Sequence, residues 1–191
     1  KMTGHLLFGK YTYNKKSNSW SVSTDEKNDA LRDPFNRFIH VVFSLSNGKH
    51  LVFCDSRKFG KVTLVDTKLT DQTSHLKNIG PEPLEKIFTV ETFTEQLLKR
   101  PSMKIKTALM DQSLISGIGN IYSDELLWLA QVRPDRQVST LSQKEFTHMF
   151  DTMKEVLMKG IDFGGDSTSD YRQIDGTQGK FHHNHNVYRK K

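Results

Sequence analysis

The short segment Gly117-Ile-Gly-Asn120 lies between two stretches whose apolar residues repeat at helical spacing, and it constrains the fold more than any other feature. Two glycines around one isoleucine let the backbone turn through conformations that a Cβ atom disfavours. A helix that starts directly after such a turn presents unpaired N–H groups, which suit a phosphate oxygen. On spacing alone, a plain helix-to-helix connector that binds nothing is the simpler alternative.

The composition narrows the class of protein. A chain of 191 residues fits one large domain or two small ones. Lys and Arg number 28 against 22 Asp and Glu, and the net charge of +6 favours a polyanionic partner such as nucleic acid. The single cysteine, Cys54, excludes an internal disulfide and is expected to be a buried structural thiol. With no membrane-spanning run and no signal-peptide pattern, we expect a reducing, cytoplasmic setting and no membrane partner.

The first half of the chain has the pattern of an antiparallel sheet. Asn47-Gly48 separates two β-rich runs and predicts a hairpin, which a third strand at 61–65 is expected to follow. Residues 13–33 are polar and predict a long exposed excursion. A proline-punctuated connector at 78–85 then marks the boundary with a helical half.

The second half has helical spacing. Helices are predicted over 92–100, 105–115, 121–131 and 141–160. Ser142 and Glu145 have the spacing of a capping box, Leu141 and Phe146 that of a hydrophobic staple, and Gly160 is expected to end the last helix. The glycine-rich remainder of the chain predicts a loop followed by a short strand.

Residues 109–136 closely resemble the helix–two-turn–helix segment of the bacterial formamidopyrimidine-DNA glycosylase and endonuclease VIII family. The segments KMTGHLLFGKY, LSNGKHLVFCDSRKFGKV, NIGPEPL, GGDSTSDY and DGTQGKF follow in the family's order. The glycine-rich passages are more similar to the formamidopyrimidine branch. The resemblance implies an α+β fold, in which residues 1–86 form the C-terminal part of an antiparallel β-sandwich. Residues 87–191 then form a helix–two-turn–helix DNA-binding domain with a lesion-capping loop.

The resemblance also implies roles for individual residues. In the family, the methionine of the MTG motif and the arginine and phenylalanine of the D-x-R-x-F-G loop fill the gap that a flipped-out nucleotide leaves. An apolar wedge and a planar guanidinium can offset part of the cost of unstacking a base. Without the resemblance, Phe59 is more simply a buried sheet residue and Arg57 a solvated turn residue. The residues expected to bind DNA are Met2, Arg57, Lys58, Phe59, Lys106, Gly119, Asn120 and Tyr122.

The glycine-rich loop that starts at Gly164 resembles the family's loop that closes over an everted purine. Consecutive glycines and short polar residues bury little surface, so the loop is expected to be mobile. The resemblance assigns this lesion-capping role to Gly164, Gly165, Thr168 and Tyr171, and the last two are expected to lie nearest the flipped base.

The family's catalytic groups are not found in this sequence. They are an N-terminal proline amine, an adjacent glutamate, a lysine, and an arginine on a four-cysteine zinc finger. We therefore expect a chain truncated at both ends, with no catalytic residue and no cofactor of its own. Zinc is expected in an intact family member, through cysteines that are absent here. His182, His183 and His185 could ligate a metal, but no CxxC partner or fourth ligand accompanies them, so no metal site is predicted.

Three functions remain open at this point. The leading one is the DNA-binding body of a bifunctional DNA glycosylase and abasic-site lyase that excises oxidised purines in base excision repair. It would act as a monomer on damaged double-stranded DNA in the bacterial cytosol. The alternative is a non-catalytic module that binds abasic or distorted DNA. An RNA-binding protein is the third, but wedge residues disfavour it because filling a void in a duplex is a DNA-repair task.

Overall fold

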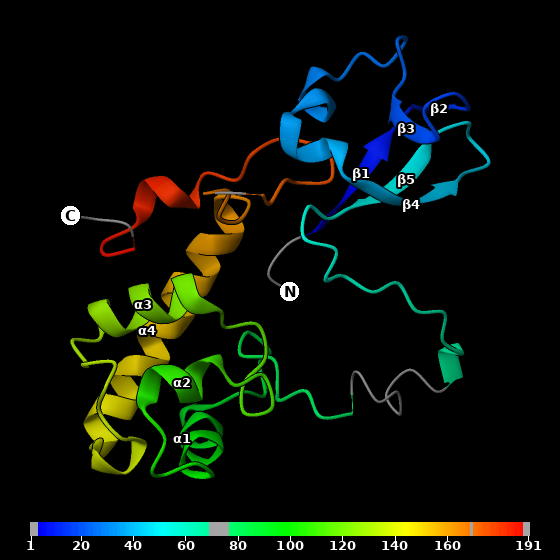
Figure 1. Cartoon of the computed structure of the whole chain (residues 1–191). Helices are drawn as coiled ribbons and strands as arrows, with labels where there is room; N and C mark the ends of the chain where they lie inside the picture. The colour runs from blue at the N-terminus through cyan, green and yellow to red at the C-terminus, as the bar shows by residue number, and fades with distance from the viewer. Residues whose placement is uncertain (1–3, 69–76, 169, 189–191) are drawn as a thin grey trace. The chain divides into compact units, whose positions relative to one another are not determined.

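The computed structural model of the protein describes residues 4–68, 77–168 and 170–188. It divides into two compact units (Figure 1). Unit 1 comprises Lys1–Thr63 and Gly160–Asn184, and unit 2 comprises Leu64–Lys159 and His185–Lys191. This division differs from the single boundary expected near residue 86. The segment 160–184 belongs with the strands because its residues bond to them: the Phe8 amide, for example, donates to the Ile174 carbonyl at 2.8 Å.

Unit 1 contains two small antiparallel sheets (Figure 1). The three-stranded sheet has the order β1 (His5–Gly9), β5 (His50–Cys54) and β4 (Ile39–Ser44), and the two-stranded sheet pairs β2 (Tyr11–Asn14) with β3 (Ser19–Val22). The predicted hairpin at Asn47-Gly48 is confirmed, because β4 and β5 pair directly and Gly48 takes the left-handed φ of +75°. The core of this unit consists of Leu7, Tyr11, Leu31, Val52 and Cys54.

Two predictions for this unit are wrong. The stretch 13–33 is not one exposed excursion. It contains β3 and the 3-10 helix Asp29–Arg32, whose Leu31 is fully buried against the sheet. The expected strand at 61–65 does not form. Its alternating residues Val62 and Leu64 are both exposed, so no sheet face is available to bury one side of a strand there.

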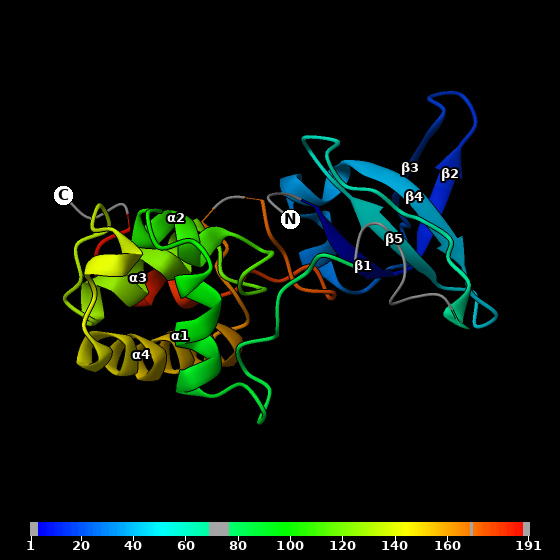
Figure 2. The same cartoon turned by 90° about the horizontal axis from the view of Figure 1, so that it is seen from below.

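Unit 2 is a bundle of four α-helices around one apolar core (Figure 2). The helices are α1 (Val90–Leu98), α2 (Ile105–Met110), α3 (Asn120–Leu129) and α4 (Gln143–Asp162), the last of which continues into unit 1. The α4 residues Phe146, Met149, Phe150 and Met153 form the buried stripe that their spacing predicts. The structure therefore confirms the mixed α+β class.

The ends of the helices follow local chemistry. The capping box before α4 is confirmed, because the Ser142 amide donates to Glu145 at 2.7 Å and the Glu145 amide donates back to the Ser142 hydroxyl at 3.3 Å. Gly160 does not end the helix. The helix closes two residues later in a Schellman turn, where the Gly164 and Gly165 amides donate to the carbonyls of Ile161 and Gly160, and both glycines have positive φ.

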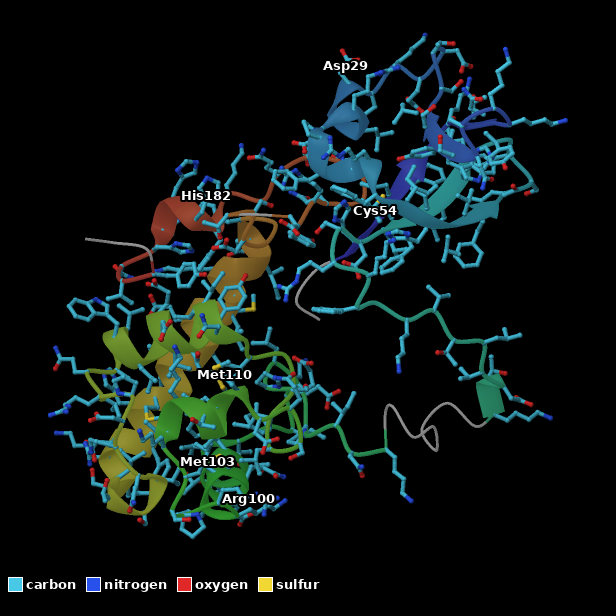
Figure 3. All side chains as sticks on the ribbon, in the orientation of Figure 1. Asp29, Cys54, Arg100, Met103, Met110 and His182 are labelled. Atoms are coloured by element: carbon cyan, nitrogen blue, oxygen red, sulfur yellow. The ribbon has the colours of Figure 1, made fainter. Side chains whose placement is uncertain are left out.

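The end of the chain also differs from the prediction. Instead of a short strand, residues Phe181–Asn184 form a 3-10 helix, preceded by an isolated antiparallel bridge between Asp166 and Lys180. Figure 3 shows His182 on this helix and Cys54 on the sheet of unit 1. Among the described residues, none of the helices has the length and apolar character needed to cross a bilayer.

Candidate functional site

A buried carboxylate shapes the loop after β5. We call residues 55–60 the wedge loop. Asp55 is only 1% exposed, and its carboxylate accepts the amide of Arg57 at 3.2 Å and the amide of Gly60 at 2.7 Å. Between them Lys58 takes a left-handed φ of +57°, which completes the turn. These partly buried hydrogen bonds to Asp55 set the backbone of the wedge loop, while the side chains of residues 57–59 are exposed.

The side chains outside the loop are the predicted Arg57 and Phe59. Phe59 is 67% exposed, which excludes the alternative of a buried sheet residue. The Arg57 guanidinium lies 4.9 Å from the centre of the Phe59 ring, at stacking distance. Lys58 between them is exposed as well. The loop thus presents an apolar ring, a planar cation and an ammonium on one turn, whereas Met2 lies outside the described residues.

The glycine turn of unit 2 leads into α3 as expected. Gly117 has a φ of +79°, and the Gln112 side chain holds the turn by accepting its amide at 2.9 Å and donating to the Ile118 carbonyl at 2.8 Å. Gly119 is the N-cap residue, with no side-chain cap, and Asn120 is the exposed first residue of the helix. Because the first amides of a helix have no partner within it, this turn presents donors to solvent.

The other two candidates of unit 2 are less open. The Lys106 ammonium lies 2.6 Å from the Asp124 carboxylate of α3, and both side chains are more than two-thirds covered. Tyr122 is half-buried on the first turn of α3. Lys106 therefore joins α2 to α3 in this structure, and a phosphate would have to compete with Asp124 for it.

The glycine-rich segment from Gly164 to Tyr171 is here called the capping loop, and the structure describes all of it except residue 169. Its described residues carry more internal structure than the composition suggests. The Thr168 amide and hydroxyl both donate to the Asp166 carboxylate, and the buried Ser167 hydroxyl donates to the Tyr171 carbonyl at 2.7 Å. The Tyr171 ring is 42% exposed and covers Gly165, where an added Cβ would come within 2.8 Å of the ring.

Sequence reasoning missed the ion pair that fixes the end of this loop. Arg172 is 2% exposed, and its guanidinium donates to both oxygens of Asp33, at 3.0 and 3.1 Å, and stacks over Phe35. Burial alone would raise the pKa of Asp33, but the Phe35 amide and the Arg172 guanidinium together hold it below its usual value. Nothing local in the sequence marks this pair, whose members are 139 residues apart.

A second buried carboxylate was also missed. Glu125 of α3 is 1% exposed and accepts the amides of Asn186, Val187 and Tyr188 at 2.6, 3.1 and 2.9 Å, together with the Asn186 side chain at 3.0 Å. Burial alone would raise the pKa of Glu125, yet these four hydrogen bonds lower it below the usual value. Glu125 thereby clasps the segment that follows the 3-10 helix onto α3.

The described residues do not fit a zinc site. They contain no group of three or more histidine, cysteine or acidic residues that could hold a metal ion. The ring centroids of His182 and His183 lie 4.0 Å apart with the planes tilted by 43°, whereas His185 is buried against Tyr188. Cys54 is buried as predicted, its thiol donates to the Asn36 carbonyl, and burial raises its pKa to about 12. A thiol held protonated in this way is a poor zinc ligand.

Comparisons with known proteins show what the chain is similar to. Residues 79–172 match the model of the formamidopyrimidine-DNA glycosylase H2TH domain, which defines the class of the helical unit. The chain is 39% identical over 159 residues to the formamidopyrimidine-DNA glycosylase of Pelotomaculum thermopropionicum and 40% identical over 151 residues to that of Herpetosiphon aurantiacus. These matches cover 83% and 79% of this chain but 57% and 54% of the two relatives.

The fold is also similar to solved structures of formamidopyrimidine-DNA glycosylases bound to DNA. The fold matches a complex between the Lactococcus lactis Fpg and abasic-site DNA with a TM-score of 0.75 and 30% identity, over 98% of this chain and 61% of that one. It also matches a MutM complex with carbocyclic 8-oxo-G DNA, with a TM-score of 0.74 and 30% identity, over 98% of this chain and 60% of that one. The chain belongs to the formamidopyrimidine-DNA glycosylase family, and it spans little more than half the length of the curated relatives it matches.

Proposed function

We propose that this protein binds damaged double-stranded DNA in base excision repair and recognises the site at which a nucleotide has left the helix. The observation that carries this proposal is the exposed pair of Arg57 and Phe59 on a loop held from beneath by Asp55. An exposed ring stacked against a planar cation suits the gap that a flipped-out nucleotide leaves in a base stack. In related structures the bound DNA contains an abasic site or a modified base.

The remaining candidates take supporting roles in this proposal. Gly119 and Asn120 offer backbone and side-chain donors to a phosphate at the start of α3, and Lys58 offers a cation. Lys106 and Tyr122 would contact the backbone nearby, and Met2 would complete the wedge. Thr168 and Tyr171 would face the flipped base, next to Gly164 and Gly165.

Fluorescence anisotropy tests the proposal with a duplex that carries a stable abasic-site analogue, compared with the intact duplex over a salt series. We expect tighter binding to the damaged duplex, and we expect Arg57→Ala and Phe59→Ala to bring the ratio of the two affinities close to one. The salt slope should change little, since it counts phosphate contacts. Arg37→Ala is the matched control, because Arg37 is also exposed and also lies over a ring, that of Phe38, at 4.8 Å. Equal, steeply salt-dependent binding to both duplexes would contradict lesion recognition.

We further propose that the residues of this chain bind DNA without supplying the nucleophile. In the family, as its resemblance implies, the whole enzyme excises oxidised purines and then cleaves the abasic site by means of an N-terminal proline amine. The five prolines of the printed chain are internal, so each ring nitrogen belongs to an amide and is not nucleophilic. The second candidate function is a module that grips abasic or distorted DNA without cutting it.

Borohydride trapping with oxidised-purine DNA tests the second proposal. We expect no covalent complex, because none of the five prolines in the sequence has a free secondary amine and the proposal gives no lysine the role of nucleophile. A stoichiometric adduct would overturn it and would identify a lysine as the nucleophile. As a DNA-repair protein of a bacterial family, the protein is proposed to act in the cytosol on the nucleoid.

A further inference from the structure

One hydrogen bond joins the wedge loop to the capping loop. The Ser56 hydroxyl donates to the Asp170 carboxylate at 2.5 Å, between residues 114 positions apart in the sequence. Both side chains are partly buried, and both loops belong to unit 1. A hydrogen bond to a carboxylate in a partly covered site is stronger than one between neutral exposed groups.

The two loops are otherwise fixed by different anchors. The wedge loop rests on Asp55, which holds the amides on either side of Arg57 and Phe59. The capping loop leaves α4 through its Schellman turn and ends at the buried pair of Arg172 with Asp33. Ser56 directly follows the anchor Asp55, and Asp170 lies two residues before the anchor Arg172, so each residue is held close to a fixed point of its own loop. The hydrogen bond between them therefore transmits a displacement from one loop to the other.

We infer that Ser56 and Asp170 are positioning residues that make insertion of the wedge and closure of the capping loop one coupled event. The inference rests on the proposed function. Neither residue need touch the lesion. Arg57 follows Ser56 directly and Tyr171 follows Asp170 directly, so the bond sets the spacing between the residue that enters the gap and the residue that faces the flipped base. Coupling of this kind raises the affinity for a lesion that engages both loops above the affinity for one that engages the wedge alone.

An affinity comparison separates these two cases. An abasic-site analogue leaves a gap for the wedge but offers no base to the capping loop, whereas an oxidised purine offers both. Ser56→Ala is expected to weaken binding to the oxidised-purine duplex by about fivefold to tenfold, the lower part of the usual range of coupling between sites. Binding to the abasic duplex should change less. Ser56→Thr keeps the hydroxyl and should restore the oxidised-purine affinity.

Ser23→Ala is the matched control. The Ser23 hydroxyl also donates to a carboxylate, that of Asp25, at 2.5 Å, and both residues belong to unit 1 but to neither loop. It should leave both affinities unchanged. The fold of each variant is checked by its urea transition followed through Trp20 of β3 in a Trp128→Phe background, since the chain has only two tryptophans and Trp20 is the one in unit 1.

A cycle of substitutions provides the second readout. In the wild-type background, the effects of Phe59→Ala and Tyr171→Ala on oxidised-purine binding should not add, because each removes part of a shared event. In the Ser56→Ala background they should become additive. A merely structural role for Ser56 would lower stability without changing this additivity.

The outcomes distinguish the inference from the function on which it rests. A protein that prefers damaged DNA through Phe59, yet is unaffected by Ser56→Ala, would overturn the coupling and leave the proposed function standing. A protein that does not prefer damaged DNA at all would overturn both. The coupling would be supported if Ser56→Ala loses the preference for oxidised purine, Ser56→Thr regains it, and Ser23→Ala keeps it.

Discussion

Asp55 in unit 1 and Glu125 in unit 2 perform the same physical task over different distances. Each is a 1% exposed carboxylate whose cost of burial is offset by backbone amides. Asp55 accepts amides two and five residues further along the chain, so it shapes one loop. Glu125 accepts amides 61 to 63 residues away, so it holds two distant segments together. The Asp55 carboxylate thus fixes the conformation of one surface loop. The Glu125 carboxylate instead joins two segments of unit 2 that are distant in the sequence.

Glu125→Gln should give the largest change. A glutamine has one acceptor oxygen where the structure needs two, and its NH2 group would face amide donors, so unit 2 should lose about 2–4 kcal/mol of unfolding free energy. Urea unfolding followed through Trp128 in a Trp20→Phe background measures it, since Trp128 lies on α3 of the same unit. The control is Glu155→Gln, whose carboxylate pairs with Lys159 on an exposed face and should matter little. Equal midpoints for the two variants would contradict the clasp.

Asp55→Asn is expected to have a smaller effect on stability and a larger one on recognition. The asparagine amide can accept one of the two loop N–H groups and must oppose the other, which costs about 1–3 kcal/mol in unit 1. Preference for abasic over intact duplex should fall with it, because the backbone that carries Arg57 and Phe59 is no longer set. Asp29→Asn, at an exposed carboxylate of the same unit, serves as control. Retained preference in Asp55→Asn would show that the wedge does not depend on this anchor.

The two glycines of the α3 turn should differ from each other by a modest amount. Gly117→Ala puts a Cβ at a φ of +79° and should cost about 1–2 kcal/mol although the space around it is open. Gly119→Ala, at an extended φ and also in open space, should cost only about 0.5 kcal/mol. If a phosphate approaches this turn, Gly119→Ala should nevertheless weaken DNA binding, because its methyl group occupies the approach. Unchanged affinity would remove Gly119 from the interface.

The smallest expected effect is on how the stability of unit 2 depends on pH. The pKa of Glu125 is lowered in the folded state, so its contribution is complete above its unfolded pKa, near 4.5, and is lost as the pH falls through the folded value. Glu145, whose pKa is lowered to about 2 by Arg136 and the Ser142 amide, acts in the same direction. Unfolding midpoints measured between pH 6 and 3 should therefore fall, and fall less steeply in Glu125→Gln. Parallel curves for the wild type and Glu125→Gln would mean that other groups cause the loss of stability in acid.

Features that depend on neighbours in the sequence were predictable. The Asn47-Gly48 hairpin and the Ser142 and Glu145 capping box follow from residues a few positions apart, and both are present. The end of α4 was misplaced because Gly160 is an adequate helix residue when Gly164 can take the left-handed turn. The exposed wedge of Arg57 and Phe59 came from family resemblance, since composition alone favoured burial of the ring.

What could not be predicted depends on distant partners. Arg172 lies in a polar run that is typical of a surface loop, and only the fold brings Asp33 to it. Glu125 follows an aspartate on a helix, where a charged residue normally indicates a solvated face. The amides that it accepts carry no side-chain signal at all, because any residue except proline supplies one. A sequence pattern therefore cannot identify a hydrogen-bond partner that is a backbone amide.

The order of the segments in unit 1 has a consequence for synthesis. Leu64–Lys159 of unit 2 is encoded between the two parts of unit 1, so Asp33 leaves the ribosome 139 residues before Arg172. At ordinary elongation rates of about 5–20 residues per second, the strands wait several seconds or more for the arginine that neutralises Asp33. During that interval the helices of unit 2 can already pack, which shortens the loop that the ion pair must close. The first part of the chain to be made therefore reaches its final packing only after Leu64–Lys159 of the helical unit has been made.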